Sequence, residues 1–221
     1  MLRSMFAGMF SVLFVAGIIG LGVYLATYEP SPAPASTPST AAAPPAGAAQ
    51  SATPTPSAVP DLPAVKIRSL PAAAKAAGCT LQSPPLQGVA HEAREFTEAD
   101  YNSNPPTSGT HFPTWYEDGV YAPGDTPELG RLVHSLEHGR IEIQYKPGTS
   151  PDTVGQLEKL VDEMDSGYHL LLFENATKMP YEVAATAWGH LLGCPKFNDK
   201  VFDALRAFRK VYVDKGPETV P

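Results

Sequence analysis

The sequence predicts a small α+β domain, a mixed sheet packed with a few helices, preceded by a single N-terminal transmembrane helix. Three observations predict this organisation. No charged residue occurs from Ser4 to Tyr28, and residues 29–62 are almost entirely Pro, Ala, Ser and Thr. The remainder, 63–221, contains both alternating and helix-periodic apolar patterns. The chain therefore divides into an anchor (1–28), a linker (29–62) and one domain (63–221).

The apolar stretch Met5–Ala26 is long enough to span a bilayer, because about 20 helical residues cross the roughly 30 Å hydrocarbon core. Arg3 precedes it, so the positive-inside rule places everything after Tyr28 outside the cytoplasm, in the periplasm or extracellular space. A cleaved signal peptide with Ala33-Pro-Ala35 as its cleavage site is the alternative. Both interpretations export the domain, and the linker is expected to be a semi-extended tether.

The predicted domain is mildly acidic. Removing Arg3, Glu29 and Asp61 from the 16 basic and 23 acidic residues leaves 15 and 21, a net charge of −6. This balance disfavours nucleic acid as a partner.

The only cysteines are Cys79 and Cys194, which lie near the two ends of the domain. A single pair outside the cytoplasm predicts a disulfide bond. Closing a loop of this length would stabilise the fold by about 4–5 kcal/mol in the chain-entropy model. The alternative makes Cys194 a copper thiolate, because His190 lies four residues before it.

Residues 97–127 are rich in Pro, Gly, Asn and Asp with interspersed aromatics, and predict a long ordered loop over the core. Pro127–His138 predicts a helix that stops at Gly139. In Arg140–Tyr145 apolar and polar residues alternate, which predicts a half-buried strand. Ser150-Pro151 predicts the start of another helix.

The remaining elements follow from the same periodicities. They are strands over Tyr168–Phe173 and Val183–Trp188 and a closing amphipathic helix over Asn198–Val213.

The segment His134-Ser-Leu-Glu-His138 makes the most definite chemical proposal. Side chains four apart on a helix have Cβ atoms about 5–6 Å apart, so both imidazoles can reach one metal at roughly 2.0–2.1 Å. His111 ends a turn that is stiffened by proline, and is the third candidate ligand. The alternatives are histidines favoured by a helix C-terminus and a loop histidine bonded to a carbonyl.

The other histidines are expected to have no part in such a site. His91 reads as a surface residue, and His169 and His190 adjoin apolar strands and read as core or edge residues.

Three blocks of the sequence resemble the signature of a bacterial family, domain of unknown function 3105. The blocks are Tyr101–His111, Leu132–Gly139 and Ala187-Trp188-Gly189. The resemblance covers nearly all of the predicted domain and implies that His111, His134 and His138 belong to one constellation.

Three imidazoles suit copper or Zn²⁺, and sulfur ligands favour Cu(I). Met164 completes the apolar stripe of a predicted helix and is interpreted as a core-packing residue. Met179 lies in a loop before a strand and is the candidate fourth ligand. The predicted cofactor is therefore copper, with zinc as the alternative.

The predicted function is a membrane-tethered, extracytoplasmic protein that binds, delivers or senses copper, with a metal-delivery protein as its partner and no catalysis. The pattern H-x-x-E-H instead allows a zinc peptidase with Glu137 as general base. The spacing of His111 and Asp118 similarly resembles zinc ligands of cell-wall D,D-peptidases. The third alternative is a metal-free interaction domain whose aromatic loop binds a partner.

Overall fold

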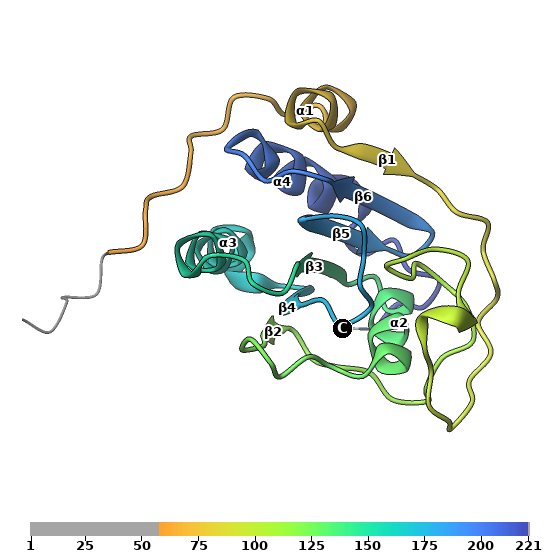
Figure 1. The fold of residues 1–221 in the computed structure, drawn as a ribbon. Helices are drawn as coiled ribbons and strands as arrows, with labels where there is room; N and C mark the ends of the chain where they lie inside the picture. Colours follow the sequence, from red (N-terminus) through yellow and green to blue (C-terminus); the bar gives the residue numbers. More distant parts are fainter. Residues whose placement is uncertain (1–57, 221) are drawn as a thin grey trace, which may run out of the picture. The chain divides into compact units, whose positions relative to one another are not determined.

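The computed structural model describes residues 58–220, which contain a six-stranded mixed sheet with helices on both faces (Figure 1). The predicted anchor Met5–Ala26 and most of the predicted linker lie outside these residues. Within residues 58–220, no helix is both long and apolar enough to cross a membrane.

Strands and helices are interspersed along the chain. In chain order they are α1 (Leu70–Ala77), β1 (Thr80–Gln82), the 3-10 turn η2 (Glu98–Asp100), β2 (Gly119–Val120), α2 (Leu129–Glu137), β3 (Ile141–Tyr145), α3 (Pro151–Glu163), the 3-10 turn η3 (Asp165–Gly167), β4 (Leu170–Glu174), β5 (Val183–Ala187), β6 (His190–Cys194) and α4 (Lys200–Tyr212).

The sheet has the strand order β1-β6-β5-β3-β4-β2. The β3–β4 and β4–β2 pairs are parallel, and the other three pairs are antiparallel. The predicted α+β class with a mixed sheet is therefore confirmed. The parallel β3–β4 pair is joined through α3, as a parallel crossover requires.

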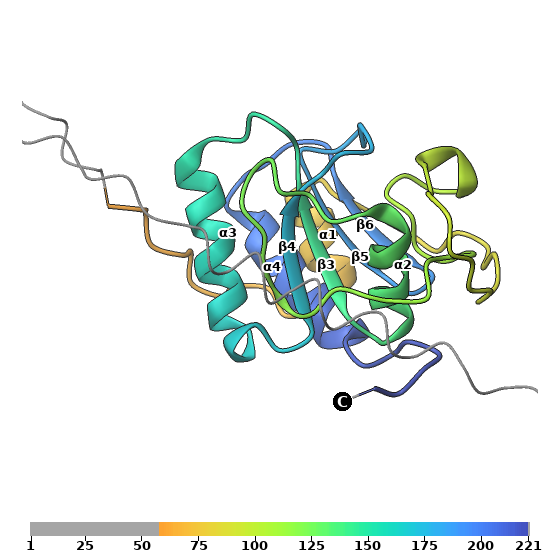
Figure 2. The same ribbon diagram turned by 90° about the horizontal axis from the view of Figure 1, so that it is seen from below.

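The main core lies between one face of the sheet and the helices α1, α3 and α4 (Figure 1). Helix α2 covers the opposite face, as the second view shows (Figure 2). There Leu132 of α2 packs against Leu171 and Phe173 of β4.

Strand β3 is buried along its whole length, so the prediction of a half-buried strand is wrong. Its alternation is real, because Ile141, Ile143 and Tyr145 join the main core. Glu142 and Gln144, on the other face, are nonetheless only 2% and 3% exposed. Elements outside the strand bury that polar face, and strand periodicity carries no information about them.

Several predicted elements agree with the structure to within a few residues. Helix α3 begins as expected, with Pro151 in its first turn and the Ser150 side chain accepting a hydrogen bond from the Thr153 N–H. Helix α4 lies inside the predicted range and buries Phe202 and Phe208. The short elements α1, β1, β2 and β6 have no counterpart among the predicted elements.

The predicted disulfide is present. Cys79 and Cys194 are bonded across a sequence separation of 115 residues. The bond joins the residue before β1 to the last residue of β6, the strand with which β1 pairs. Cys194 is therefore not available as the copper thiolate that was the alternative.

Candidate metal centre

Helix α2 supplies three neighbouring functional side chains at its C-terminal end: His134, Glu137 and, directly after the last helical residue, His138. Residues three and four apart share one face of a helix. Gly139 ends the helix with φ +81°, and a Cβ atom there would lie 2.8 Å from Cα of Asp214. Glycine is therefore required, both for its backbone angle and for its lack of a side chain.

The loop preceding α2 contributes His91 and His111. These two residues form an isolated parallel bridge. The Glu92 N–H donates to the His111 carbonyl at 2.8 Å, and the His111 N–H donates to the Ala90 carbonyl at 2.9 Å. The bridge holds both imidazoles beside α2, with ring centroids 4.5 Å apart.

Four of these side chains converge and could hold a metal ion. We call His91, His111, His134 and Glu137 the inner group; their ligand atoms all lie within 4.8 Å of one another. Glu137 Oε2 lies 2.9 Å from His111 Nε2 and 3.3 Å from His91 Nε2. Ligand atoms on one tetrahedral metal would be about 3.3 Å apart, given metal–nitrogen bonds of about 2.0–2.1 Å.

Backbone carbonyls orient two of the imidazoles. His111 Nδ1 donates to the Gly109 carbonyl at 2.8 Å, and His134 Nδ1 donates to the Phe112 carbonyl at 2.7 Å. In each neutral ring the proton is then on Nδ1, so Nε2 carries the free lone pair. Metal-binding histidines typically use their second nitrogen in this way.

His111 Nε2 and Glu137 Oε2 face each other without a hydrogen bond. The two atoms are 2.9 Å apart and neither has a hydrogen-bond partner among the described residues, although His91 Nε2 lies 3.3 Å from the same carboxylate oxygen. Both side chains are at most 1% exposed. A cation placed beside these two buried atoms would satisfy both of them.

Burial sets the protonation of the group. Desolvation lowers the pKa of His111 and of His134, so both rings are neutral at pH 7 and can bind a metal. Desolvation, reinforced by the nearby Glu218 carboxylate, raises the pKa of Glu137 above its usual value. A metal cation would reverse this shift by stabilising the carboxylate form.

A second set of side chains adjoins the first. We call His134, His138 and Glu218 the outer group; it too meets the distance requirement for a metal. His138 Nε2 lies 3.0 Å from His134 Nε2 and 3.4 Å from Glu218 Oε2. Desolvation, then the neighbouring His134 and Arg140, lower the pKa of His138 to about 4, so its ring is neutral at pH 7.

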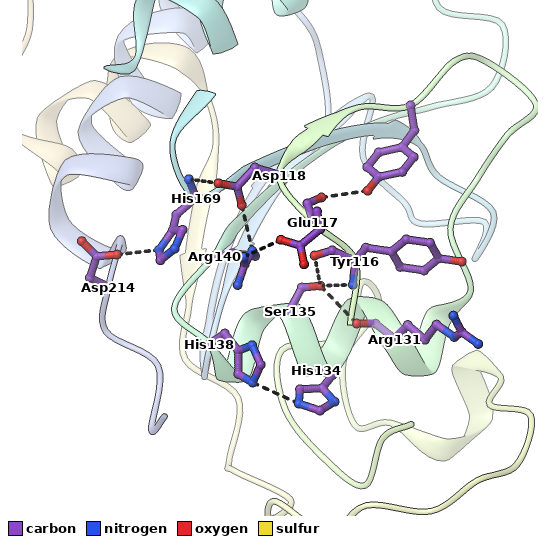
Figure 3. Close-up of polar contacts among 11 residues, drawn as sticks. Tyr116, Glu117, Asp118, Arg131, His134, Ser135, His138, Arg140, His169 and Asp214 are labelled. Carbon is purple, nitrogen blue, oxygen red and sulfur yellow. Dashed lines mark hydrogen bonds and ion pairs between the residues drawn. The ribbon is translucent and has the colours of Figure 1, made fainter. Parts of the chain in front are cut away.

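An ion-pair network centred on the buried Arg140 supports the segment that covers α2 (Figure 3). The Arg140 guanidinium donates to Asp118 Oδ1 at 2.8 Å and to Glu117 Oε2 at 3.2 Å. Asp118 Oδ2 accepts from the His169 N–H at 2.8 Å. Trp115 lies just before this network, with its ring centroid 4.4 Å from that of His138.

Of the predicted ligands, His111 and His134 lie in the inner group and His134 and His138 in the outer group. No single group among the described residues contains all three, contrary to the one constellation that the family resemblance implied. Met179 is placed elsewhere, because its side chain packs in an apolar cluster with Ala184, Leu191 and Tyr181. Both carboxylate oxygens of Asp118, the zinc ligand in the D,D-peptidase interpretation, are bonded to Arg140 and to the His169 backbone.

Sequence reasoning missed His91 and Glu218. His91 was expected at the surface, and its side chain is indeed 36% exposed, yet its Nε2 points at Glu137. Its pairing with His111 joins residues 20 positions apart, which no local pattern reports. His169 and His190 lie outside both groups, as expected; His169 binds Asp214, and His190 stacks on Tyr212.

Comparison with known proteins identifies the family and nothing more specific. No curated protein matches the chain, and no solved structure matches it. A family described as "Protein of unknown function (DUF3105)" matches residues 92–220, which include His111, α2 and Glu218. Because this match spans more than half of the sequence, the chain belongs to the DUF3105 family.

Proposed function

We propose that this protein is a membrane-tethered, extracytoplasmic metal-binding protein that handles copper through the inner group. The observation that carries the proposal is the pair His111 Nε2 and Glu137 Oε2, two buried acceptors 2.9 Å apart with no hydrogen bond between them. A bound cation satisfies both atoms at once. His91 and His134 complete a set of three nitrogens and one oxygen.

The ligand types favour a divalent transition metal. Imidazole nitrogens suit copper and zinc, whereas thioether sulfur selects Cu(I). Met179, the predicted sulfur ligand, packs among apolar side chains. We therefore propose Cu²⁺ as the ion bound most tightly and Zn²⁺ as its weaker competitor, in the order that divalent metals usually follow.

The position of Glu137 favours binding over hydrolysis. In a zinc peptidase with the H-x-x-E-H pattern, His134 and His138 would bind the metal and Glu137 would activate a water. Here the Glu137 carboxylate lies 2.9 Å from His111 Nε2 and 3.3 Å from His91 Nε2, among the nitrogens that would hold the metal. A carboxylate used as a ligand cannot also serve as the general base.

The test is metal analysis of the purified full-length chain after separate loading with Cu²⁺, Cu⁺ and Zn²⁺. We expect one tightly held equivalent of Cu²⁺ in the wild type and its loss in a His134→Ala/His138→Ala variant. His190→Gln is the matched control, because His190 belongs to neither group. Equal metal retention by the wild type and the His134→Ala/His138→Ala variant would refute the proposal.

A further inference from the structure

The outer group carries an inference that rests on the proposed function. We infer that His134, His138 and Glu218 form a second, weaker metal position, through which the ion reaches the inner group while it stays bound to His134. The outer group has the same ligand types as the inner group, but three ligands instead of four. Fewer ligands make a weaker and more rapidly exchanging site.

His134 can serve only one position at a time. Its Nδ1 is committed to the Phe112 carbonyl at 2.7 Å, which leaves a single lone pair, on Nε2. One lone pair binds one metal ion, so the two groups cannot both use His134 at once. The protein should therefore hold one ion, which exchanges His138 and Glu218 for the remaining inner ligands.

The transfer is a ligand exchange without change of oxidation state. Before metal binds, His138 Nε2–H donates to the His134 Nε2 lone pair across 3.0 Å. A metal bound to His138 Nε2 would require the other neutral tautomer of this ring, with its proton on Nδ1, a buried atom with no hydrogen-bond partner among the described residues. Both Nε2 lone pairs are then free for the metal, and the protein gains or loses no proton.

The outer group is open to solvent on the side of Glu218. The Glu218 side chain is half exposed, whereas the His138 side chain is only 2% exposed. The backbone holds Glu218 in place, because its N–H donates to the Glu137 carbonyl at 3.1 Å. A side chain at Gly216 would collide with that same carbonyl, so the C-terminal segment lies directly against the end of α2.

The first test disables the inner group and asks whether binding survives. In the full-length His91→Ala/Glu137→Gln variant, we expect one equivalent of Cu²⁺ bound about 100-fold more weakly than in the wild type. Adding Glu218→Gln should abolish this residual binding, whereas adding Glu158→Gln, an exposed charge on α3, should not. His91 is partly exposed, so its replacement should leave the fold intact.

These outcomes separate the inference from the function on which it rests. A wild type that binds no Cu²⁺ refutes the proposed function itself. A wild type that binds Cu²⁺, together with a His91→Ala/Glu137→Gln variant that binds none, overturns only the second position. Residual Cu²⁺ binding that is unchanged when Glu218→Gln is added to the His91→Ala/Glu137→Gln variant overturns the second position as well.

The second test measures the rate of Cu²⁺ uptake by quenching of tryptophan fluorescence. The chain has two tryptophans, and Trp115 lies beside His138 of the outer group. In a Trp188→Phe background, Glu218→Gln should slow uptake about tenfold with little change in equilibrium affinity. Glu218→Asp keeps the charge but shortens the ligand, so Cu²⁺ uptake by this variant should also be slow. Uptake at the wild-type rate in these Glu218 variants would overturn the inference.

Discussion

His111 Nε2 lies 2.9 Å from Glu137 Oε2, and both side chains are almost completely buried. His111 comes from a loop and Glu137 from the last residue of α2. The His111 ring presents a lone pair, because its Nδ1 proton is used by the Gly109 carbonyl. A bound cation would satisfy both atoms at once, and this relationship underlies the first two predictions.

Glu137→Gln should weaken Cu²⁺ and Zn²⁺ binding by about 10- to 100-fold, because it replaces a charged ligand with a neutral amide. Isothermal titration of the full-length protein measures this effect. The zinc-peptidase alternative makes the opposite prediction: full metal binding together with lost cleavage of peptide or peptidoglycan. Retained affinity in Glu137→Gln would therefore favour the hydrolase.

Metal should stabilise the folded domain against heat. Free Cu²⁺ at 100 times its Kd contributes about 2.7 kcal/mol if it binds only the folded state. We expect a higher Tm on adding Cu²⁺, reversal by a chelator, and no shift in His111→Gln. The metal-free interaction domain, by contrast, predicts the same melting curve with and without chelator.

Met179→Leu should leave Cu²⁺ affinity unchanged, because the Met179 side chain packs with Ala184, Leu191 and Tyr181. Leucine and methionine have similar volumes, so the loss of stability should stay under about 1.5 kcal/mol. Parallel titrations with Cu²⁺ and Cu⁺ provide the measurement. A loss of Cu⁺ binding alone would restore Met179 as a ligand.

Glu142→Gln should stabilise the protein at pH 8 and have little effect at pH 4. Burial raises the pKa of Glu142 from 4.5 to about 8, although hydrogen bonds from Thr186 and Gln144 partly oppose this shift. Between these values the folded state retains a proton that the unfolded state releases. Wild-type stability therefore falls as pH rises through this window, by up to about 1.4 kcal/mol per pH unit.

Urea unfolding of wild type and Glu142→Gln at pH 4, 6 and 8 provides the measurement. Comparing the two proteins at each pH cancels the titration of all other groups. A stability difference that does not grow with pH would show that Glu142 is not held protonated by the fold.

Replacing both cysteines, in Cys79→Ala/Cys194→Ala, should lower the free energy of unfolding by about 2–5 kcal/mol. The bond closes a loop with a sequence separation of 115 residues and joins the start of β1 to the end of β6. Thermal unfolding of oxidised and reduced wild type provides the comparison. Metal affinity should be unaffected at temperatures where the variant stays folded, because neither cysteine belongs to a ligand group.

The sequence by itself determined the features that depend on neighbouring residues. Apolar periodicity predicted α3, α4 and the central strands, and Gly139 predicted the end of α2. The spacing of His134 and His138 placed both on one helical face. The two cysteines, interpreted through the predicted export, predicted the disulfide that the structure contains.

Only the tertiary structure decided which distant side chains share the site. His91 reaches Glu137 through a bridge to His111, and Glu218 reaches His138 because the C-terminal segment folds back onto α2. Met179 had no periodic role in the sequence, yet it fills an apolar cluster. Local periodicity reports which face of an element is apolar, whereas long-range packing determines what covers that face. The His134–His138 pair was therefore visible in the sequence, and the ligands around it were not.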